Sequence, residues 1–241
     1  MAETILVVGS TGNIGFSAIT AALRSKRNVL AVVRSQSSAD KLVKYIGSDK
    51  GITIAEADVT SDTGVKGVVE KVRAGKLPAF QHVWTSVGGE YTFDKIENVS
   101  TERLRRNMNI GFEAGFFAYR DTIKYLREQN NPNSTWTICT GAQGEIAQFV
   151  VPAMTQGALF PFCKAAAREN EETNVRVNEV YLCYRVENDK DAVEHGVTKA
   201  SDFANVYEMI LDSPDVRSSR VCVENADEDL KKLKVRPFQK I

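Results

Sequence analysis

The apolar residues of this chain alternate along its length between short runs typical of strands and longer runs with helical spacing. The strand-like runs are continuous, which is typical of strands covered by helices on both faces. Strands are expected over residues 4–8, 29–33, 52–57, 82–86, 135–140, 175–182 and 220–223. Helices are expected over residues 14–26, 39–46, 64–74, 101–129 with a break near 107–109, 154–170 and 202–211. This alternation predicts an α/β fold, a Rossmann-type doubly wound sheet of seven parallel strands flanked by helices.

The totals fit one domain spanning residues 1–241, with the charged run 227–234 expected to form a solvated helix. Lys plus Arg and Asp plus Glu number 31 each, so no basic surplus points to nucleic acid. No apolar run is long enough to span a membrane, and no signal peptide is expected before the first strand, which favours the cytoplasm. The four cysteines are expected to be free thiols, and the two histidines have no partner at metal-site spacing.

A glycine-rich stretch follows the first expected strand and opens the first expected helix. It consists of Gly9, Ser10, Thr11, Gly12, Asn13, Ile14 and Gly15. Glycine allows a tight turn and lets the backbone approach a pyrophosphate, which the free N–H groups and positive dipole end of the helix attract. A plain glycine-rich turn between strand and helix is the alternative interpretation. The position of the stretch favours a dinucleotide site.

The residues after the second expected strand indicate which dinucleotide binds. Folds that bind NAD place an acidic side chain about 20 residues after the glycines, where it accepts hydrogen bonds from the ribose 2′-hydroxyl. This chain has Arg34 and Ser35 instead, and its next carboxylate is Asp40. A guanidinium beside a hydroxyl suits a 2′-phosphate, because Arg donates paired hydrogen bonds to phosphate oxygens. We therefore expect NADP(H), with an ordinary surface Arg as the alternative interpretation of Arg34.

Two further turns lie at the ends of expected strands, where open α/β sheets bind ligands. Asp58 follows the third strand and can accept a hydrogen bond from the adenine amino group, while Val59 can pack on the ring. Ser86, Val87 and Gly88 end or follow the fourth strand, and a glycine there lets the chain pass close to the adenosine ribose. All of these residues are expected to contact the cofactor.

With these motifs in this order, the chain resembles the short-chain dehydrogenase/reductase superfamily over nearly its whole length. Three later segments add to the resemblance, namely residues 107–111 (Asn-Met-Asn-Ile-Gly), 156–159 (Gln-Gly-Ala-Leu) and 175–178 (Val-Arg-Val-Asn). The active site of that family uses an Asn, a Ser, and a Tyr and a Lys in the motif Tyr-x-x-x-Lys. The Tyr donates a proton, the Lys lowers the pKa of the Tyr and holds the ribose, and the Ser polarises the carbonyl.

On this resemblance, Asn109 matches the family Asn and Thr140 could substitute for the Ser. The Tyr position falls at Pro152 and the Lys position at Gln156, which can hydrogen-bond a ribose but cannot lower the pKa of a neighbour by its charge. Ketone reduction would then lack its usual proton donor. Reduction of an iminium ion needs no such donor, because this substrate already carries the positive charge.

The same logic applies to the fungal bifunctional reductase/Diels–Alderase enzymes of malbrancheamide and paraherquamide biosynthesis, which residues 131–137 and 155–160 resemble. Those enzymes carry an acidic residue and a Trp in an additional Pro-rich segment. The matching residues 149–154 of this chain have neither. The resemblance therefore suggests a relative, and it does not extend to the residues of the Diels–Alderase activity.

Several loop residues at the carboxyl edge of the expected sheet are candidates for substrate contact or proton transfer. Tyr184 could supply a replacement acid near the nicotinamide, or could pack on the core. Glu145 could be a general acid if it is buried, or an exposed loop residue. Met154 lies in the apolar stretch 149–154, which favours a hydrophobic small-molecule substrate.

Three functions fit these observations, and analogy of fold does not separate them. The first is an NADPH-dependent reductase of an activated small molecule, iminium or conjugated, in secondary metabolism. The second is a non-redox enzyme, such as a cyclase, isomerase or pericyclase, with a structural cofactor. The third is a non-catalytic NADP(H)-binding sensor. Residues 109–129 carry more apolar side chains than one sheet-facing stripe requires, so a homodimer or homotetramer is expected.

Overall fold

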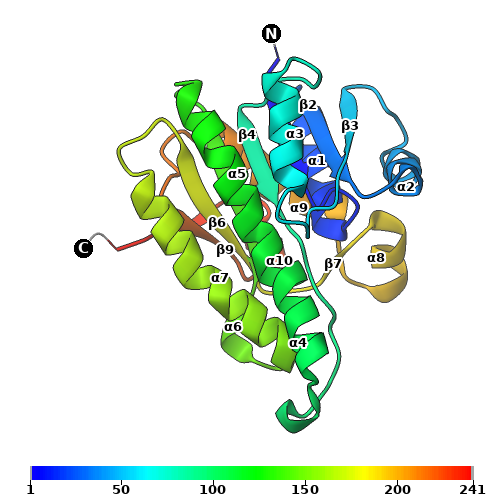
Figure 1. Cartoon of the computed structure of the whole chain (residues 1–241). Coiled ribbons are helices and arrows are strands. Elements are labelled where there is room, and N and C mark those ends of the chain that lie inside the picture. Colours follow the sequence, from blue (N-terminus) through cyan, green and yellow to red (C-terminus); the bar gives the residue numbers. More distant parts are fainter. Residues whose placement is uncertain (1, 240–241) are drawn as a thin grey trace.

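The computed structural model describes residues 2–239 and has an eight-stranded sheet at its centre (Figure 1). Seven of these strands run parallel, and all seven match expected strands. In sheet order they are β9 (Ser219–Val223), β6 (Arg176–Leu182), β5 (Thr135–Gly141), β4 (His82–Thr85), β1 (Thr4–Val8), β2 (Asn28–Val33) and β3 (Ile52–Glu56). The order reverses between β1 and β4, so the expected doubly wound sheet is confirmed.

An eighth strand, β10 (Lys234–Pro237), pairs with the outer side of β9 and runs antiparallel to it. The expectation of a solvated helix over residues 227–234 is wrong. Only a four-residue helix, α10 (Ala226–Asp229), forms there. The Asp229 carboxylate accepts hydrogen bonds from two backbone amides just after β9 (2.7 and 2.8 Å), which holds a tight turn and sends the chain back along the sheet edge.

Helices cover both faces of the sheet. The face toward the viewer in Figure 1 carries α3 (Gly64–Arg73), α5 (Ala114–Glu128) and α7 (Val150–Glu169). The opposite face carries α1 (Asn13–Arg24), α2 (Gln36–Ile46) and α9 (Ala200–Asp212). Neighbouring residues of one strand therefore enter different cores, as Ile5 and Leu6 do, and both are fully buried. This arrangement explains why the strands are continuous apolar runs.

The long helix expected over residues 101–129 contains a widened turn where a break was expected. Helix α4 (Thr101–Met108) passes into a π-helical turn, η2 (Asn109–Glu113), and then into α5. A π turn inserts one extra residue into the helix and is frequent at functional sites. A Cβ atom at Gly111 would lie 2.9 Å from the Thr155 side chain, so this turn packs directly on α7.

The segment between β6 and α9 forms a small unit that was not expected from the sequence. It consists of β7 (Val186–Glu187), α8 (Asp189–His195) and β8 (Thr198–Lys199), with the two strands paired in parallel. The Asn188 amide donates to the Asn13 side-chain oxygen on α1 (3.1 Å), and the Tyr45 hydroxyl on α2 donates to Asp189 (3.1 Å). The unit is therefore fastened to α1 and α2.

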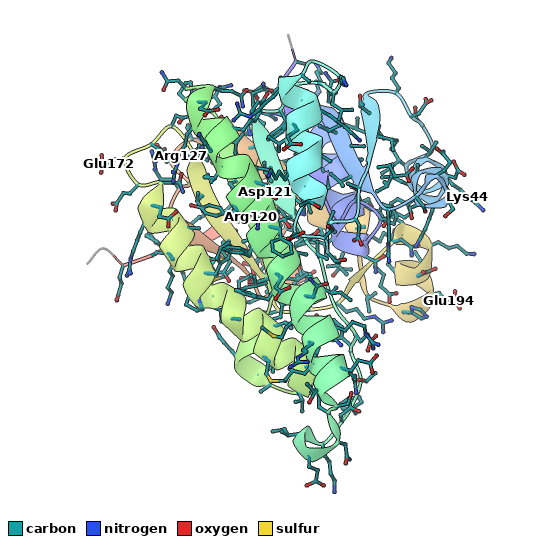
Figure 2. The ribbon with its side chains drawn as sticks, viewed as in Figure 1. Lys44, Arg120, Asp121, Arg127, Glu172 and Glu194 are labelled. Carbon is teal, nitrogen blue, oxygen red and sulfur yellow. The ribbon has the colours of Figure 1, made fainter. Side chains whose placement is uncertain are left out.

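Charged side chains dominate the outside of the molecule. In Figure 2, Lys44 on α2 and Glu194 on α8 point outward, and both are exposed. No helix within residues 2–239 combines the length and the apolarity needed to cross a membrane.

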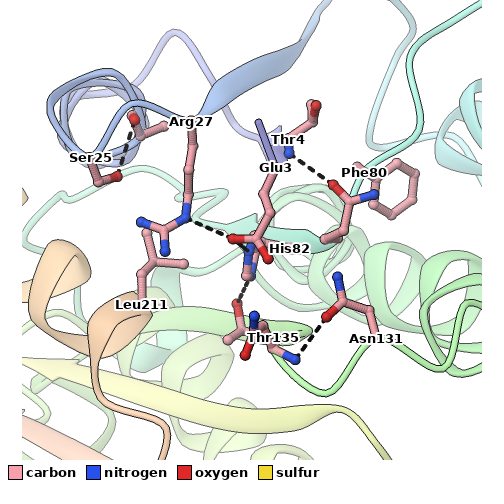
Figure 3. A network of polar contacts seen from close by, with 12 residues as sticks. Glu3, Thr4, Ser25, Arg27, Phe80, His82, Asn131, Thr135 and Leu211 are labelled. Atoms are coloured by element: carbon pink, nitrogen blue, oxygen red, sulfur yellow. Dashed lines mark hydrogen bonds and ion pairs between the residues drawn. The ribbon is translucent and has the colours of Figure 1, made fainter. Parts of the chain in front are cut away.

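At the amino edge of the sheet, a polar network joins the residues just before β1 and β2 to the first residues of β4 and β5 (Figure 3). The Glu3 carboxylate accepts a hydrogen bond from Arg27 (3.1 Å) and lies 3.1 Å from Nε2 of the buried His82. A carboxylate only accepts, so Nε2 carries the proton and Nδ1 accepts from the Thr135 hydroxyl (3.0 Å). The hydrogen bond from His82 is the main cause that lowers the pKa of Glu3 from 4.5 to about 2, while burial opposes it.

Glu3→Gln should destabilise the protein by about 2 kcal/mol at neutral pH, because hydrogen bonds to a charged group are lost. A carboxyl group with a lowered folded-state pKa stabilises the fold above its unfolded pKa of 4.5 and loses that contribution as the pH falls toward 2. The difference between the wild type and the variant should therefore shrink over this range in urea denaturation. The exposed pair Lys95–Glu97 provides the control, since Glu97→Gln should have little effect at any pH. A pH-independent loss for Glu3→Gln would contradict this account.

Candidate active site

The turn after β1 packs against the turn after β4. Gly9 has φ +89°, and a Cβ atom there would lie 2.4 Å from the Ser86 carbonyl oxygen. A Cβ atom at Gly15, in the first turn of α1, would lie 2.1 Å from the Gly9 carbonyl oxygen. The buried Ser10 hydroxyl lies 2.7 Å from the Val32 carbonyl oxygen and ties this turn to β2. The glycines thus hold the start of α1 against the carboxyl edge of the sheet.

The N-terminus of α1 is open toward this edge. Gly12 is the N-cap, no side chain of the described residues caps the helix, and its first turn contains no acidic residue. Thr11 and Ile14 flank the cap and are half-buried. Asn13 accepts the Asn188 amide, so its side-chain oxygen is already used. Uncapped N–H groups at the positive end of a helix form a site for an anion.

The start of α2 gathers three hydroxyl groups beside Arg34. Ser35 caps the helix by accepting from the Ser38 amide (3.4 Å), and its hydroxyl lies 2.9 Å from that of Ser37 and 3.2 Å from that of Ser38. Arg34 is exposed, and the first turn of α2 contains no acidic residue. Sequence reasoning found Arg34 and Ser35 but missed the other two serines, whose proximity depends on the helix starting at Gln36. Together these groups can hold a phosphate.

Asp58 and Val59 lie where β3 ends. The Asp58 carboxylate accepts hydrogen bonds from the Thr60 hydroxyl (2.7 Å) and amide (3.0 Å), and these lower the pKa of Asp58, with the Arg34 charge as a weaker cause. The Asp58 carboxylate is therefore ionised at neutral pH, and its negative charge interacts with the positive charge of Arg34. Val59 packs on the core beneath α3. The structure thus places the ends of β2 and β3 side by side.

The turn after β4 continues this edge. The Ser86 hydroxyl accepts from the Trp84 indole (3.1 Å), and Val87 packs on the core. A Cβ atom at Gly88 would meet open space, so this glycine borders a region where a ligand can approach. A Cβ atom at Gly89 would lie 2.7 Å from Oδ1 of Asn107, so it is Gly89 that the packing requires.

The two asparagines near the π turn have different surroundings. Asn109 donates to the Thr60 carbonyl oxygen and to Glu113 (2.9 Å each), so its side chain faces the loop after β3. Asn107 is 1% exposed, accepts from the Glu90 amide (3.1 Å) and donates to the Arg103 carbonyl oxygen (3.0 Å). The asparagine that joins α4 to the β4 turn is therefore Asn107. The pattern Asn-x-Asn contained both candidates, and only the helix geometry separates them.

Helix α7 presents Gln156 to the end of β5. Gln156 is 7% exposed, and its side-chain oxygen accepts from the Gly141 amide (2.7 Å). Within residues 2–239 its amide N–H groups make no hydrogen bond, so they can donate to a ligand. Pro152, one turn earlier, is buried. The structure thus places the Gln156 side chain at the end of β5, with the turn of α7 that holds Pro152 preceding it.

The Thr140 side chain is buried and faces Glu179. Thr140 is 2% exposed, and its hydroxyl donates to Glu179 (2.6 Å), which is fully buried on β6. Arg220 on β9 pairs with the same carboxylate (2.8 Å). Burial raises the pKa of Glu179, and the hydrogen bonds from Arg220 and Thr140 counteract this effect. Thr140 therefore has a structural partner that the sequence did not reveal.

Glu145 belongs to the same network. It lies on α6 (Gln143–Ile146), accepts from the Tyr181 hydroxyl (2.8 Å) and pairs with Arg220 (2.9 Å). Burial would raise the pKa of Glu145, but the hydrogen bonds from Tyr181 and Arg220 prevail and lower it. The exposed, ionised carboxylate is unsuited to the role of general acid. Met154 on α7 is 40% exposed and borders the same edge of the sheet.

Tyr184 follows β6 and packs on the core beneath α1 and α9. Its hydroxyl is buried and has no hydrogen-bond partner among residues 2–239. Burial raises the pKa of Tyr184 strongly. The phenol is therefore protonated at neutral pH, and a ligand that reached it would find an unused donor.

The fold is of the Rossmann type, and the turns after β1, β2, β3 and β4 lie along the carboxyl edge of its sheet. A sequence model of the short chain dehydrogenase family matches residues 3–190. A protein from Pestalotiopsis fici, named short-chain dehydrogenase/reductase iacG, is 50% identical over 228 residues and is matched over 92% of both chains. The chain therefore belongs to the short-chain dehydrogenase/reductase family of NAD(P)-dependent oxidoreductases.

Solved structures share the fold at much lower sequence identity. ElxO with NADP bound superposes with a TM-score of 0.78 at 14% identity, over 90% of this chain and 94% of ElxO. A 3-ketoacyl-(acyl-carrier-protein) reductase from Brucella melitensis, complexed with NADH, also gives 0.78, at 16% identity over 92% and 96% of the two chains. These likenesses show that the architecture is the one common to the family.

Gly9→Ala should destabilise the protein by at least about 2 kcal/mol in urea denaturation, because alanine is strained at positive φ and its Cβ atom would overlap the Ser86 carbonyl oxygen. Gly12→Ala is the matched control in the same turn. Gly12 has φ −85°, and its new Cβ atom would meet the Gly9 carbonyl oxygen at an ordinary 3.6 Å. It should change stability by less than about 0.5 kcal/mol. Equal losses for both variants would show that the close approach does not matter.

Proposed function

We propose that this chain is an NADPH-dependent reductase that transfers hydride to an activated small molecule, an iminium ion or a conjugated acceptor, in secondary metabolism. One observation carries the proposal. A cradle suited to a phosphorylated dinucleotide lies beside a helix, α7, that has Pro152 and Gln156 where the resemblance predicts Tyr and Lys. Proline has no ionisable group, and the Gln156 amide cannot protonate an alkoxide.

The cradle offers partners to four parts of NADP(H). The uncapped N-terminus of α1 would hold the pyrophosphate, and Arg34 with the Ser35 hydroxyl cluster would hold the 2′-phosphate. The Asp58 carboxylate would accept a hydrogen bond from the adenine amino group. The side-chain amide N–H groups of Gln156 would donate a hydrogen bond to a ribose hydroxyl. ElxO, which has a similar fold, holds NADP in its solved structure, and this supports the choice of cofactor. When bound, the cofactor supplies hydride.

The other polar groups at this edge are poor proton donors for a ketone. Thr140 donates to Glu179, and Glu145 is ionised in its pair with Arg220. The raised pKa of Tyr184 makes it a weak acid. An iminium carbon accepts hydride while its C=N π electrons become the nitrogen lone pair, so the charge is neutralised without proton transfer. The site therefore suits a substrate that is activated before it binds.

A non-redox reaction with a structural cofactor and a non-catalytic NADP(H) sensor remain the alternative functions. Apolar side chains at the carboxyl edge, such as Ile146 (60% exposed) and Met154, support a small-molecule substrate over a sensor. The membership of the family favours hydride transfer over the non-redox reaction. Both alternatives predict that no substrate oxidises NADPH, which separates them from the reductase.

Arg34→Ala should weaken NADPH binding about ten- to hundredfold and leave NADH binding unchanged, because only NADPH has the 2′-phosphate that Arg34 would contact. Calorimetric titration of both cofactors measures this directly. Lys41→Ala removes another exposed cation from α2 and serves as the control, with unchanged affinity expected for both cofactors. Equal affinity of the wild type for NADPH and NADH would overturn the assignment of the cofactor.

The enzyme should reduce cyclic imines and fail on the matching ketones, because loss of general acid catalysis costs about 10²–10⁴-fold. The rate with an imine should fall as the pH rises and the iminium ion loses its proton. Single-turnover oxidation of NADPH with paired imine and ketone substrates measures both effects. Comparable ketone reduction would reveal a replacement acid, and Tyr184→Phe would then test the unused phenol. Absence of oxidation with either substrate would favour the non-redox or sensor function.

A further inference from the structure

Three aromatic side chains from two distant segments meet at the carboxyl edge of the sheet. Tyr91 and Phe93 lie on the loop between β4 and the short helix η1 (Ile96–Asn98), and Phe149 is the N-cap of α7. The Phe149 ring lies edge-on to Tyr91 (5.5 Å between centroids) and is tilted against Phe93 (4.5 Å). Tyr91 and Phe93 are nonetheless 55% and 75% exposed. These three residues form what we call the aromatic clamp.

The loop that carries the clamp is held in place by α4. Arg106 pairs with Glu90 (2.7 Å) on one side of the two aromatic residues, and Arg103 pairs with Asp94 (2.8 Å) on the other. The buried Asn107 also accepts the Glu90 amide. The exposed rings are therefore fixed at both ends of their segment, and their exposure is a property of an anchored loop.

The clamp adjoins the cofactor cradle. Its loop continues directly from the glycine pair Gly88–Gly89, and Phe149 lies one turn before Pro152 on α7. Burial raises the pKa of Tyr91, and Cys139 on β5 is a second cause, while more than half of the Tyr91 surface stays exposed. The clamp thus joins the loop that follows β4 to the first residue before α7.

The segment after β6 is fastened to helices that cover the opposite face of the sheet. It is fastened to α1 through Asn188 and to α2 through Asp189. The exposed rings of the aromatic clamp therefore offer a large apolar surface beside the cradle. Aromatic rings favour stacked or edge-on contact with other flat π systems.

We propose that the aromatic clamp, Tyr91, Phe93 and Phe149, binds the flat, apolar ring system of the substrate and so selects an aromatic or fused-ring electrophile. The identity of the reacting group rests on the proposed function, whereas the binding of the ring does not. The clamp acts as a specificity surface. It binds the unreactive ring system of the substrate while the reactive carbon lies against the cofactor.

Two cyclic imines, one with a fused benzene ring and one without it, test the proposal. 3,4-Dihydroisoquinoline carries the ring, and 1-pyrroline lacks it. Phe93→Ala should lower kcat/KM for 3,4-dihydroisoquinoline about tenfold, chiefly through KM, and change that for 1-pyrroline less than twofold. Tyr91→Phe keeps the ring and should retain the wild-type preference. Val193→Ala removes an apolar side chain of similar exposure (67%) on α8 and should change neither substrate.

Calorimetric binding of 3,4-dihydroisoquinoline to the protein saturated with NADP⁺ separates the clamp from the reaction. If neither imine oxidises NADPH but Phe93→Ala weakens this binding about tenfold and Val193→Ala does not, the clamp stands and the reductase proposal fails. If the wild type turns over both imines equally and Phe93→Ala changes neither binding nor kcat/KM, the clamp is overturned and the reductase stands. If Phe93→Ala leaves imine binding unchanged but lowers the mass measured by light scattering, the loop lies in a contact between subunits. This outcome would overturn the clamp proposal.

Discussion

A Cβ atom at Gly9 would lie 2.4 Å from the Ser86 carbonyl oxygen, and one at Gly15 would lie 2.1 Å from the Gly9 carbonyl oxygen. These two close approaches set where α1 begins relative to β1 and β4. The uncapped end of that helix then faces the crevice at which the strand order reverses, the place where open α/β sheets bind ligands. Every cofactor contact that we propose depends on this backbone packing.

The second organising interaction is the buried ion pair of Glu179 and Arg220. Arg220 lies against the rings of both Phe160 and Tyr181, at 4.5 and 4.6 Å from their centroids, and so joins α7 to β6 and β9. A buried carboxylate needs compensating partners, because isolation from water is costly for a charge. Thr140 supplies one of those partners. A residue suggested for catalysis by its position in the sequence is thus used to stabilise the interior.

The relatives show how far this architecture tolerates change. The fold persists in structures only 14–16% identical to this chain, so the packing of helices on the sheet tolerates wide substitution. The residues at its carboxyl edge carry the specific chemistry of each protein. In this chain that edge combines a phosphate-binding cradle, a helix α7 with Pro152 and Gln156, and an anchored aromatic loop. The combination explains why a dinucleotide site and an unusual substrate are proposed together.

The sequence by itself determined the seven parallel strands and the position of the Gly9–Gly15 turn, because continuous apolar runs and glycine spacing are local signals. It also placed Arg34 and Ser35 at the end of β2. It did not reveal β10, since its pairing with β9 is a contact between segments rather than a local preference. Only the tertiary structure decided that Asn107 rather than Asn109 meets the β4 turn, that Thr140 bonds Glu179, and that Tyr91, Phe93 and Phe149 converge. In each case the direction of a side chain depends on how helices and strands far apart in the chain pack together, and no local pattern of residues records that geometry.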